Sequence, residues 1–217
     1  MAPDDRRILA GLRRGDAAAF ATLVDRHSGA MLRVALAYVP TRAAAEEVVQ
    51  DTWIAVIRGI DGFEGRSSLQ TWIFRILVNV AMRAGARERR SMPFSALAAA
   101  EDTGEPAVDP ARFLPADHER FPGHWAIPPA AWPTPEDGLL AGEIREVIAA
   151  AVAALPAAQR TVISLRDIEG WSSDEVAEAL EISPGNQRLL LHRARSRVRA
   201  AIERYVTAES IDDTEGR

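Results

Sequence analysis

Two closely spaced helix-start signals in the last third of the chain limit its fold more than any other feature. Ser172 is followed three residues later by Glu175, the pattern of a capping box, which satisfies the first amide groups of a helix. Ser183 and Pro184 form a second start signal, separated from the first helix by a three-residue turn, 181–183. A short helix, a three-residue turn and a longer helix together predict a helix-turn-helix unit.

The second helix of this unit is strongly basic, although the 217-residue chain has a formal net charge of −5. Residues 183–205 contain six arginines and one glutamate. In a helix-turn-helix unit the second helix lies in the DNA major groove, where Arg binds guanine or phosphate. The alternative is a solvated basic helix, but cap, turn length and charge together favour DNA binding. The side chains expected to face DNA are Arg188, His192, Arg193, Arg195 and Arg199. Those expected to pack inward are Leu191, Ala194, Val198, Ala201, Ile202 and Tyr205.

Apolar residues recur every three or four positions in the first 90 residues, which is the period of one helical face. Asp16 and Thr41 are expected to cap two helices, and Ser67 or Ser68 a third. Because few strand signals compete, we expect an all-α fold. The expected inward positions of the second and third helices are Ala45, Val48, Val49, Trp53, Val56, Ile57 and Ile60, and Leu69, Trp72, Ile73, Ile76, Leu77 and Val80.

A segment rich in Pro and acidic residues, 91–137, separates two helical regions. It has no sustained hydrophobic period, so it is predicted to be an extended acidic linker. The expected organisation is therefore a helical domain over 1–90, the linker, a helix-turn-helix domain over 138–207 and an acidic tail over 208–217. Four aromatic residues of the linker are too apolar for a fully solvated segment, and some of them are expected to pack against another surface. They are Phe113, Phe121, Trp125 and Trp132.

Composition and motifs exclude several classes of function. The chain has no Cys, which excludes disulfides and thiolate metal sites. It has no phosphate-binding Gly loop, HExxH motif or nucleophile elbow, so we expect no cofactor and no catalysis. It also has no signal peptide and no run of about 18 apolar residues, so we expect a cytoplasmic protein that does not insert into membranes. Metal binding is disfavoured because the candidate ligands lie in the Pro-rich linker without helical spacing: Asp117, His118, Glu119 and His124.

Two further surfaces are candidates for binding. Residues 75–90 have a net charge of +4 beside two aromatic residues, a mixture that can follow a single nucleic-acid strand. Trp72 is in phase with the packed stripe, so the better candidates there are Phe74, Arg75, Asn79 and Arg83. The 41–59 helix has an acidic side that also carries an apolar residue, and it is either a solvated face or a docking face for a basic partner. That side consists of Glu46, Glu47, Gln50, Asp51 and Ile54.

Taken together, these features resemble the extracytoplasmic-function (ECF) subfamily of bacterial RNA polymerase sigma factors. The segment AEEVVQDTWIAVIRGIDGFEGRSSLQTWIFRILVN is similar to region 2 of that family. The segment LPAAQRTVISLRDIEGWSSDEVAEALEISPGNQRLLLHRARSRVR is similar to its region 4. The resemblance covers about residues 12–90 and 137–205. Two blocks in the family's order and at the usual separation are more specific than either block alone.

The resemblance implies a sigma factor, not an enzyme, that binds core RNA polymerase and promoter DNA and assists promoter melting. Region 2 would bind the clamp helices of the polymerase β′ subunit, and region 4 would lean on the β flap. An anti-sigma factor is a further partner common in the family, and the location would be the cytoplasm and its nucleoid. The residues implied at the clamp helices are Glu47, Gln50, Asp51 and Ile54.

The resemblance also implies which residues contact promoter DNA. Region 2 would hold the −10 element as a single strand, with one base flipped into the loop 61–68, and region 4 would bind the double-stranded −35 element. The residues implied at the −10 element are Gly65, Arg66, Ser67, Ser68, Phe74, Arg75, Asn79 and Arg83. Those implied at the −35 element are Asn186, Arg188, Leu189, His192, Arg193, Arg195 and Arg199.

The sequence departs from the family pattern in its helix-turn-helix. Glu181 stands where the family's turn usually has Gly, so either a left-handed residue there is strained by about 1 kcal/mol or the turn differs slightly. In the final helix, Gln187 stands where the family more usually has an apolar residue, and Leu190 stands where it more usually has a basic one. We therefore expect binding to the −35 element, but the family's sequence preference is not carried over.

Two other classes of protein fit parts of the pattern. A free-standing helix-turn-helix regulator with an N-terminal helical sensor domain would bind its operator without polymerase. A small helical enzyme could use the aromatic linker as a pocket wall, but it would need a convergent polar site, and the sequence shows none. Dependence on core polymerase distinguishes a sigma factor from both.

Overall fold

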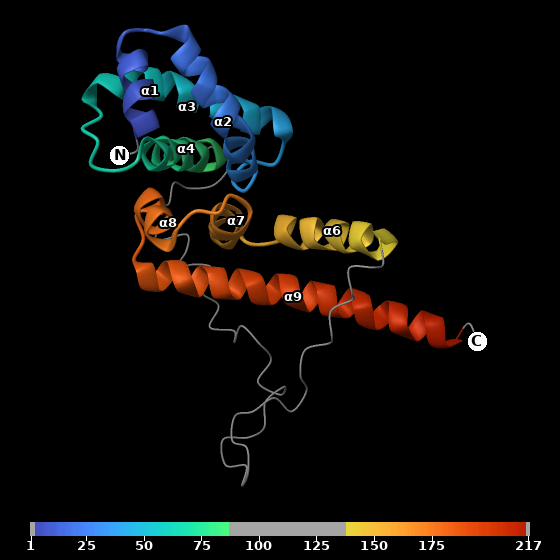
Figure 1. Ribbon diagram of the computed structural model, residues 1–217. Helices are drawn as coiled ribbons and strands as arrows, with labels where there is room; N and C mark the ends of the chain where they lie inside the picture. Colours follow the sequence, from blue (N-terminus) through green and yellow to red (C-terminus); the bar gives the residue numbers. More distant parts are fainter. Residues whose placement is uncertain (1–2, 87–137, 216–217) are drawn as a thin grey trace. The chain divides into compact units, whose positions relative to one another are not determined.

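The computed structural model describes residues 3–86 and 138–215, and every regular element in these ranges is a helix (Figure 1). The predicted all-α fold is therefore confirmed for the described part of the chain. The predicted linker lies outside the described residues, and with it the aromatic residues and the metal-ligand candidates named above. Within the described ranges, no helix is long and apolar enough to cross a membrane, and no group of three or more His, Asp or Glu could hold a metal ion.

The described residues form two compact units. One unit contains residues 3–86 and 156–191, and the other contains 138–155 and 192–215. The first unit thus joins the N-terminal helices to most of the helix-turn-helix. This grouping differs from the predicted domains, whose boundaries remain a prediction.

Four helices form the N-terminal part of the first unit. Asp16 Oδ1 accepts a hydrogen bond from the Ala18 amide at 2.9 Å, and Thr41 Oγ1 accepts one from the Ala44 amide at 3.2 Å. Both predicted caps are confirmed, because each side chain satisfies an amide that the first helical turn leaves unpaired. The four helices and a short 3₁₀ turn are α1 (Pro3–Arg13), α2 (Ala17–Ala35), α3 (Arg42–Gly59), η1 (Ile60–Gly62) and α4 (Leu69–Ala86).

The core of this part lies among α2, α3 and α4, with α1 closing one side through two buried residues, Ile8 and Leu9. Full burial of such side chains stabilises the fold by about 1.5–3 kcal/mol each. The fully buried aliphatic side chains that these helices contribute are Leu23, Met31, Val34, Val56, Leu69, Ile73 and Leu77.

The same unit contains the first part of the helix-turn-helix. Helix α7 (Ala157–Ile163) continues into a π-helical turn, η3 (Ser164–Ile168), and α8 (Ser173–Leu180) follows. The predicted capping box is confirmed: the Ser172 amide donates to Glu175 Oε2 at 2.8 Å, and Ser172 Oγ accepts from the Glu175 amide at 3.2 Å. Helix α9 (Pro184–Glu215) begins after the turn.

The second unit consists of α6 (Gly138–Ala153) and the later part of α9. The Tyr205 hydroxyl donates a hydrogen bond to Glu143 Oε2 at 2.5 Å, which links the two helices, and Ile202 is buried. Helix α9 continues to Glu215, into the segment that the sequence predicts as a tail.

Candidate nucleic-acid and protein interfaces

Helix α9 presents basic side chains to solvent from its first turns. Ser183 Oγ accepts a hydrogen bond from the Asn186 amide at 3.2 Å, which fixes the start of the helix. Asn186 and Arg193 are half-buried, and Leu189 is 40% exposed. Four further exposed residues follow one another at intervals of four, three and four positions, so they share one helical face. They are Arg188, His192, Arg195 and Arg199.

The opposite side of α9 is packed largely as predicted. Leu191, Ala194 and Ile202 are buried, which confirms them, while Val198, Ala201 and Tyr205 are half-buried. The sequence did not identify three further buried residues of α9, which are Gln187, Leu190 and Ser196. Leu190 is 1% exposed, and Gln187 is fully buried with a side-chain amide that has no hydrogen-bond partner among the described residues. Both positions that depart from the family pattern therefore belong to the core, not to the DNA-facing surface.

The turn between α8 and α9 adopts the first of the two alternatives for Glu181, a strained left-handed residue. Glu181 has φ 54° and ψ 41°, the left-handed conformation. The Ile182 amide donates to the Ala177 carbonyl at 3.1 Å and the Glu181 amide donates to the Glu178 carbonyl at 3.4 Å, the two bonds of a Schellman motif. This motif favours Gly at the left-handed position, because a side chain there costs about 1 kcal/mol.

Helix α4 is packed on two sides, whereas the sequence predicts one. Leu69, Ile73 and Leu77 are buried as predicted, but Phe74 is fully buried as well. The sequence placed Phe74 off the packed stripe, and its burial shows that this position is wrong, while its contact with DNA stays a prediction. Its ring packs edge-on against Trp171, with centroids 4.8 Å apart, and Trp171 comes from the loop before α8. A partner so distant in sequence cannot be seen in the period of one helix.

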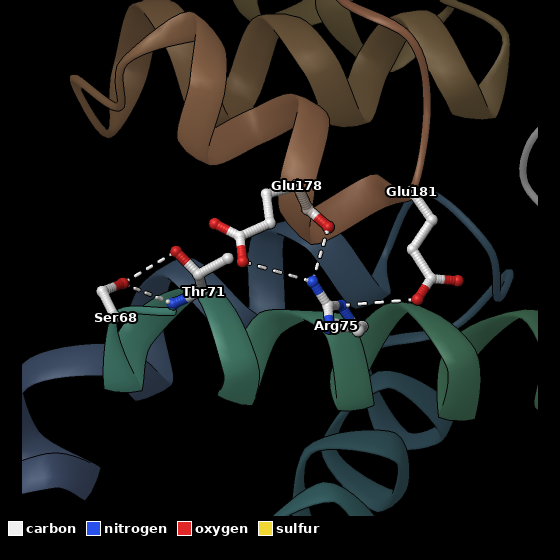
Figure 2. Close-up of polar contacts among 5 residues, drawn as sticks. All are labelled: Ser68, Thr71, Arg75, Glu178 and Glu181. Atoms are coloured by element: carbon white, nitrogen blue, oxygen red, sulfur yellow. Dashed lines mark hydrogen bonds and ion pairs between the residues drawn. The ribbon is translucent and has the colours of Figure 1, made fainter. Parts of the chain in front are cut away.

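Arg75, a second candidate for DNA contact, is held by α8. Its Nη2 atom donates a hydrogen bond to the Glu178 carbonyl at 3.0 Å and lies 3.6 Å from Glu178 Oε1. Its Nε atom lies 3.5 Å from Glu181 Oε1. Figure 2 shows the guanidinium between these two acidic residues. Farther along α4, Asn79 is half-buried and Arg83 is exposed.

The loop before α4 is fixed at both ends. Arg13 Nη2 donates to the Phe63 carbonyl at 2.6 Å, and the Phe63 ring packs on Trp72 with centroids 5.0 Å apart. At the other end Ser68, not Ser67, caps α4: its Oγ accepts from the Thr71 amide at 3.0 Å (Figure 2). Of the other residues predicted to contact the −10 element here, Gly65 has φ 72° and is half-buried, Ser67 is half-buried, and Arg66 is exposed 3.1 Å from Glu64.

Helix α3 presents the predicted acidic side to solvent. Glu47, Gln50 and Asp51 are exposed, and Ile54 is 46% exposed although it is apolar. Ile57 was predicted to pack inward, but it is 54% exposed, one turn after Ile54. The exposed side of α3 thus combines acidic and amide groups with two isoleucines, a composition suited to a protein interface with an apolar centre and a polar rim.

A buried histidine lies beside the two-sided helix α4. His27 of α2 is 6% exposed, and its ring centroid is 6.1 Å from that of Phe74. Burial lowers the pKa of His27 below its ordinary value, and the positive charge of Arg26 lowers it further. The carboxylates of Asp5 and Glu169 act in the opposite direction, but burial dominates.

Comparisons with known proteins agree with this arrangement. The family model Sigma-70 region 2 matches residues 23–91, and the model Sigma-70, region 4 matches residues 145–198. The ECF RNA polymerase sigma-E factor of Escherichia coli strain K12 is 28% identical over 194 residues, covering 89% of this chain and 92% of that protein. The RNA polymerase sigma-H factor of Pseudomonas aeruginosa is 27% identical over 199 residues, covering 92% and 94%.

A solved structure has a similar fold. It is the structure of CnrH in complex with the cytosolic domain of CnrY, with a TM-score of 0.55 and 23% identity, covering 91% of this chain and 96% of that one. The two family models together match more than half of the chain, in the order region 2 and then region 4. The chain therefore belongs to the ECF subfamily of bacterial RNA polymerase sigma factors.

Proposed function

We propose that this sigma factor directs core RNA polymerase to its promoters through three surfaces, on α3, on α4 with its preceding loop, and on α9. Membership of the family makes it a transcription initiation factor whose partners are core RNA polymerase and promoter DNA. We assign it no catalytic reaction. Its place of action would be the cytoplasm, at the nucleoid, where both partners are found.

The observation that carries the proposal is the exposed face of α9. Arg188, His192 and Arg195 line this face while the opposite side of the helix is packed. A helix whose first turns offer Arg side chains to solvent can place them against base edges in the major groove of the −35 element. Arg193 and Arg199 would bind phosphate, and Asn186 and Leu189 would lie nearest the bases.

The exposed side of α3 would bind the clamp helices of the polymerase β′ subunit. In this proposal Ile54 supplies the apolar centre, and Glu47, Gln50 and Asp51 surround it. Charges of this kind orient the partner and raise the association rate more than they raise affinity. The helix-turn-helix would contact the flap of the polymerase β subunit.

The loop 63–68 and α4 would contact the single-stranded −10 element. Gly65, Arg66, Ser67 and Ser68 would border the position of the flipped base, followed by Arg75, Asn79 and Arg83 along α4. Taking one base out of its stack costs a few kcal/mol. Anchoring at polymerase and at the −35 element would offset this cost.

We also propose an anti-sigma factor as a partner. Support comes from CnrH, which has a similar fold and was solved with the cytosolic domain of a second protein, CnrY. Purification of the tagged chain from its own cells, followed by mass spectrometry, should recover a protein that blocks its transcription activity. Recovery of polymerase subunits alone from cells under every growth condition would contradict this partner.

Run-off transcription tests the main proposal. Purified core polymerase, with and without the full chain, is incubated with a library of genomic fragments. We expect discrete transcript starts that need both proteins. Binding of the chain alone to an operator, with no effect on polymerase, would instead identify a free-standing regulator.

Variants of α9 assign the −35 surface within this assay. The double variant Arg188→Ala and Arg193→Ala should strongly reduce starts that depend on the −35 element, because each lost base or phosphate contact weakens binding. Arg204→Ala is the matched control, since Arg204 is exposed on the same helix but outside the proposed surface. Full retention of starts by the double variant would contradict the assignment.

Variants of α3 assign the clamp surface. Asp51→Ala combined with Ile54→Ala should weaken binding to core polymerase without affecting the stability of the chain, because both side chains are exposed. Asp25→Ala is the control, since Asp25 is an exposed acid on α2. Unchanged affinity of the double variant for core polymerase would refute this surface.

A further inference from the structure

We propose that α1 positions the loop that binds the −10 element, and that Arg13, at the end of α1, is the positioning residue. Arg13 holds the Phe63 carbonyl, and this contact fixes the path of the loop 63–68 before DNA binds. The inference rests on the proposed function, because it concerns this loop as a DNA-binding segment. It adds a role for α1, which lies before the residues 23–91 that the region 2 family model matches.

Helix α1 is seated closely on α2. Ile8 and Leu9 anchor its apolar side in the core, where both are buried. Gly11 is buried one turn later, and a Cβ atom added there would lie 2.7 Å from the Cβ atom of Ala19 on α2. Two carbon atoms do not approach so closely without a shift of one helix. Glycine at this position therefore sets how close the two helices lie.

The end of α1 is fixed by the turn that leads into α2. The Asp16 amide donates to the Gly11 carbonyl at 3.0 Å. The Gly15 amide donates to the Leu12 carbonyl at 2.9 Å, which completes a Schellman motif, and Gly15 has the left-handed φ of 72° that the motif uses. Asp16 also caps α2. Because one turn ends α1 and starts α2, the backbone of Arg13 has a defined position relative to α2.

Phe63 is held through its ring, its amide and its carbonyl. The residue is 5% exposed, and its ring packs on Trp72 with centroids 5.0 Å apart. Its amide donates to the Ile60 carbonyl at 3.2 Å, and its carbonyl accepts from Arg13 Nη2 at 2.6 Å. The carbonyl belongs to the planar peptide unit that joins Phe63 to Glu64. The contact with Arg13 therefore sets the direction in which the loop continues.

The residues proposed to contact DNA lie between this anchor and a second one. Ser68 caps α4 by accepting a hydrogen bond from the Thr71 amide at 3.0 Å (Figure 2). Residues 64–67 connect the two anchors, and they include the exposed Arg66 and the left-handed Gly65. A short segment between two fixed points can present a preformed site, which lowers the ordering cost of binding. Loss of one anchor should raise that cost.

The alternative is that Arg13 binds a DNA phosphate directly, since its side chain is exposed. The geometry favours positioning, because Nη2 already donates a charge-assisted hydrogen bond to the Phe63 carbonyl. The two roles differ in their dependence on salt. Loss of one phosphate contact lowers the slope of log affinity against log salt concentration by about 0.7 for a single strand. Loss of a positioning contact leaves this slope unchanged.

Spin-label line shapes of the free, full-length chain test the anchor without DNA. The chain contains no Cys, so Glu64→Cys provides one labelling site, at an exposed position next to Phe63. Arg13→Met should make the label more mobile, because it keeps an unbranched side chain but removes the donor. Arg14→Met is the control, since it removes the same charge at the next position, which is also exposed. Equal mobility in the two variants would overturn the proposal.

The consequence for DNA is measured with holoenzyme assembled from core polymerase and the full chain. The probe is the non-template strand of a promoter located by run-off transcription, with 2-aminopurine, which fluoresces more strongly when unstacked, at each −10 position in turn. We expect one position to brighten with the wild type. Arg13→Met should bind this probe about threefold to tenfold more weakly, because a smaller fraction of its loops has the binding conformation.

Two further measurements on the same probe exclude a phosphate contact and a loss of folding. The salt slope of Arg13→Met should equal that of the wild type, and Arg13→Lys, which keeps an N–H donor, should recover most of the affinity. The urea midpoint and the affinity for the −35 duplex should not change. An unchanged probe affinity in Arg13→Met, or a lower salt slope, would refute the positioning role.

A substitution that leaves Arg13 in place tests the seating of α1. Gly11→Ala should push α1 away from α2 and weaken binding of the same probe. Adding Ala19→Gly removes the opposing methyl group and should restore binding. Full binding by Gly11→Ala, or no recovery in the double variant, would show that α1 does not position the loop.

These readouts separate the positioning role from the proposed function. If the loop does not bind DNA, the label will still respond to Arg13→Met, but no position of the probe will brighten with the wild type. If the loop binds DNA without help from α1, one position will brighten equally with the wild type and with Arg13→Met. The first result removes the proposed −10 contact of the loop, and the second removes the positioning role of Arg13.

Discussion

Helices α4 and α9 carry the same kind of basic surface but present it differently. On α9 Arg188 and Arg195 are exposed, and the apolar side is packed. On α4 the corresponding arginine, Arg75, is paired with Glu178 and Glu181, and its neighbour Phe74 is buried. A basic helix is thus available for DNA only where no acidic element of the same chain reaches it. This difference predicts that the free protein reads duplex DNA more readily than it reads a single strand.

The largest expected effect is a loss of stability when the side of α4 that packs against Trp171 is truncated. Phe74→Ala should lower the free energy of unfolding by about 3–5 kcal/mol, because it removes a fully buried ring and leaves a cavity. Urea denaturation of the full chain measures this loss. Leu189→Ala on α9 is the comparison, and its effect should stay within about 0.5 kcal/mol because Leu189 is exposed. Equal and small effects at the two positions would mean that Phe74 faces solvent, as Leu189 does.

The next effect concerns duplex DNA. Once run-off transcription has located a promoter, Arg188→Ala should weaken binding of its −35 duplex by about 1–3 kcal/mol, the usual value of a bidentate Arg–guanine contact. Arg75→Ala should leave the affinity for this duplex unchanged. Fluorescence anisotropy at constant salt measures both affinities. A loss of duplex binding in Arg75→Ala as large as that in Arg188→Ala would remove the distinction between the two helices.

A smaller effect separates backbone strain from charge at the turn between α8 and α9. Glu181→Gly and Glu181→Ala both remove the carboxylate from Arg75, but only glycine relieves the left-handed strain. The glycine variant should therefore be about 1 kcal/mol more stable than the alanine variant in urea denaturation. Equal stabilities would show that the turn is not strained in solution.

The smallest expected effect is a pH dependence of the protein's stability, caused by His27 beside α4. Because burial lowers the pKa of His27 in the folded protein, the unfolded chain takes up the proton first as pH falls. Stability should be complete above about pH 6.5 and should decrease below it. Arg26, Asp5 and Glu169 are the charged groups that act on this histidine. Urea midpoints measured across this range should fall with pH in the wild type and fall less in His27→Gln, and identical slopes would contradict the assignment.

Local signals in the sequence predicted much of the fold. The caps at Asp16, Thr41 and Ser172 are all found in the structure. Each depends on residues within one or two turns of one another, and this is the range over which capping and helical periodicity operate. The exposed basic face of α9 was predicted for the same reason.

Long-range contacts could not be predicted from a single sequence. Phe74 meets Trp171, and Arg75 meets Glu178, across about half of the chain. Periodicity identifies the face of a helix that is apolar enough to pack, but it does not identify a second partner that approaches from another element. Ile57 shows the opposite error, because an apolar residue in phase with the core remains exposed. Sequence reasoning therefore found the basic and acidic surfaces but not the contacts that cover one of them.

The most direct test of this account is hydroxyl-radical footprinting of Trp171 in the free full-length chain. We expect Trp171 to be protected, because it packs against Phe74 and is nearly inaccessible. Leu189 serves as an exposed reference in the same chain. Oxidation of Trp171 as rapid as that of Leu189 would contradict the claim that this side of α4 is covered.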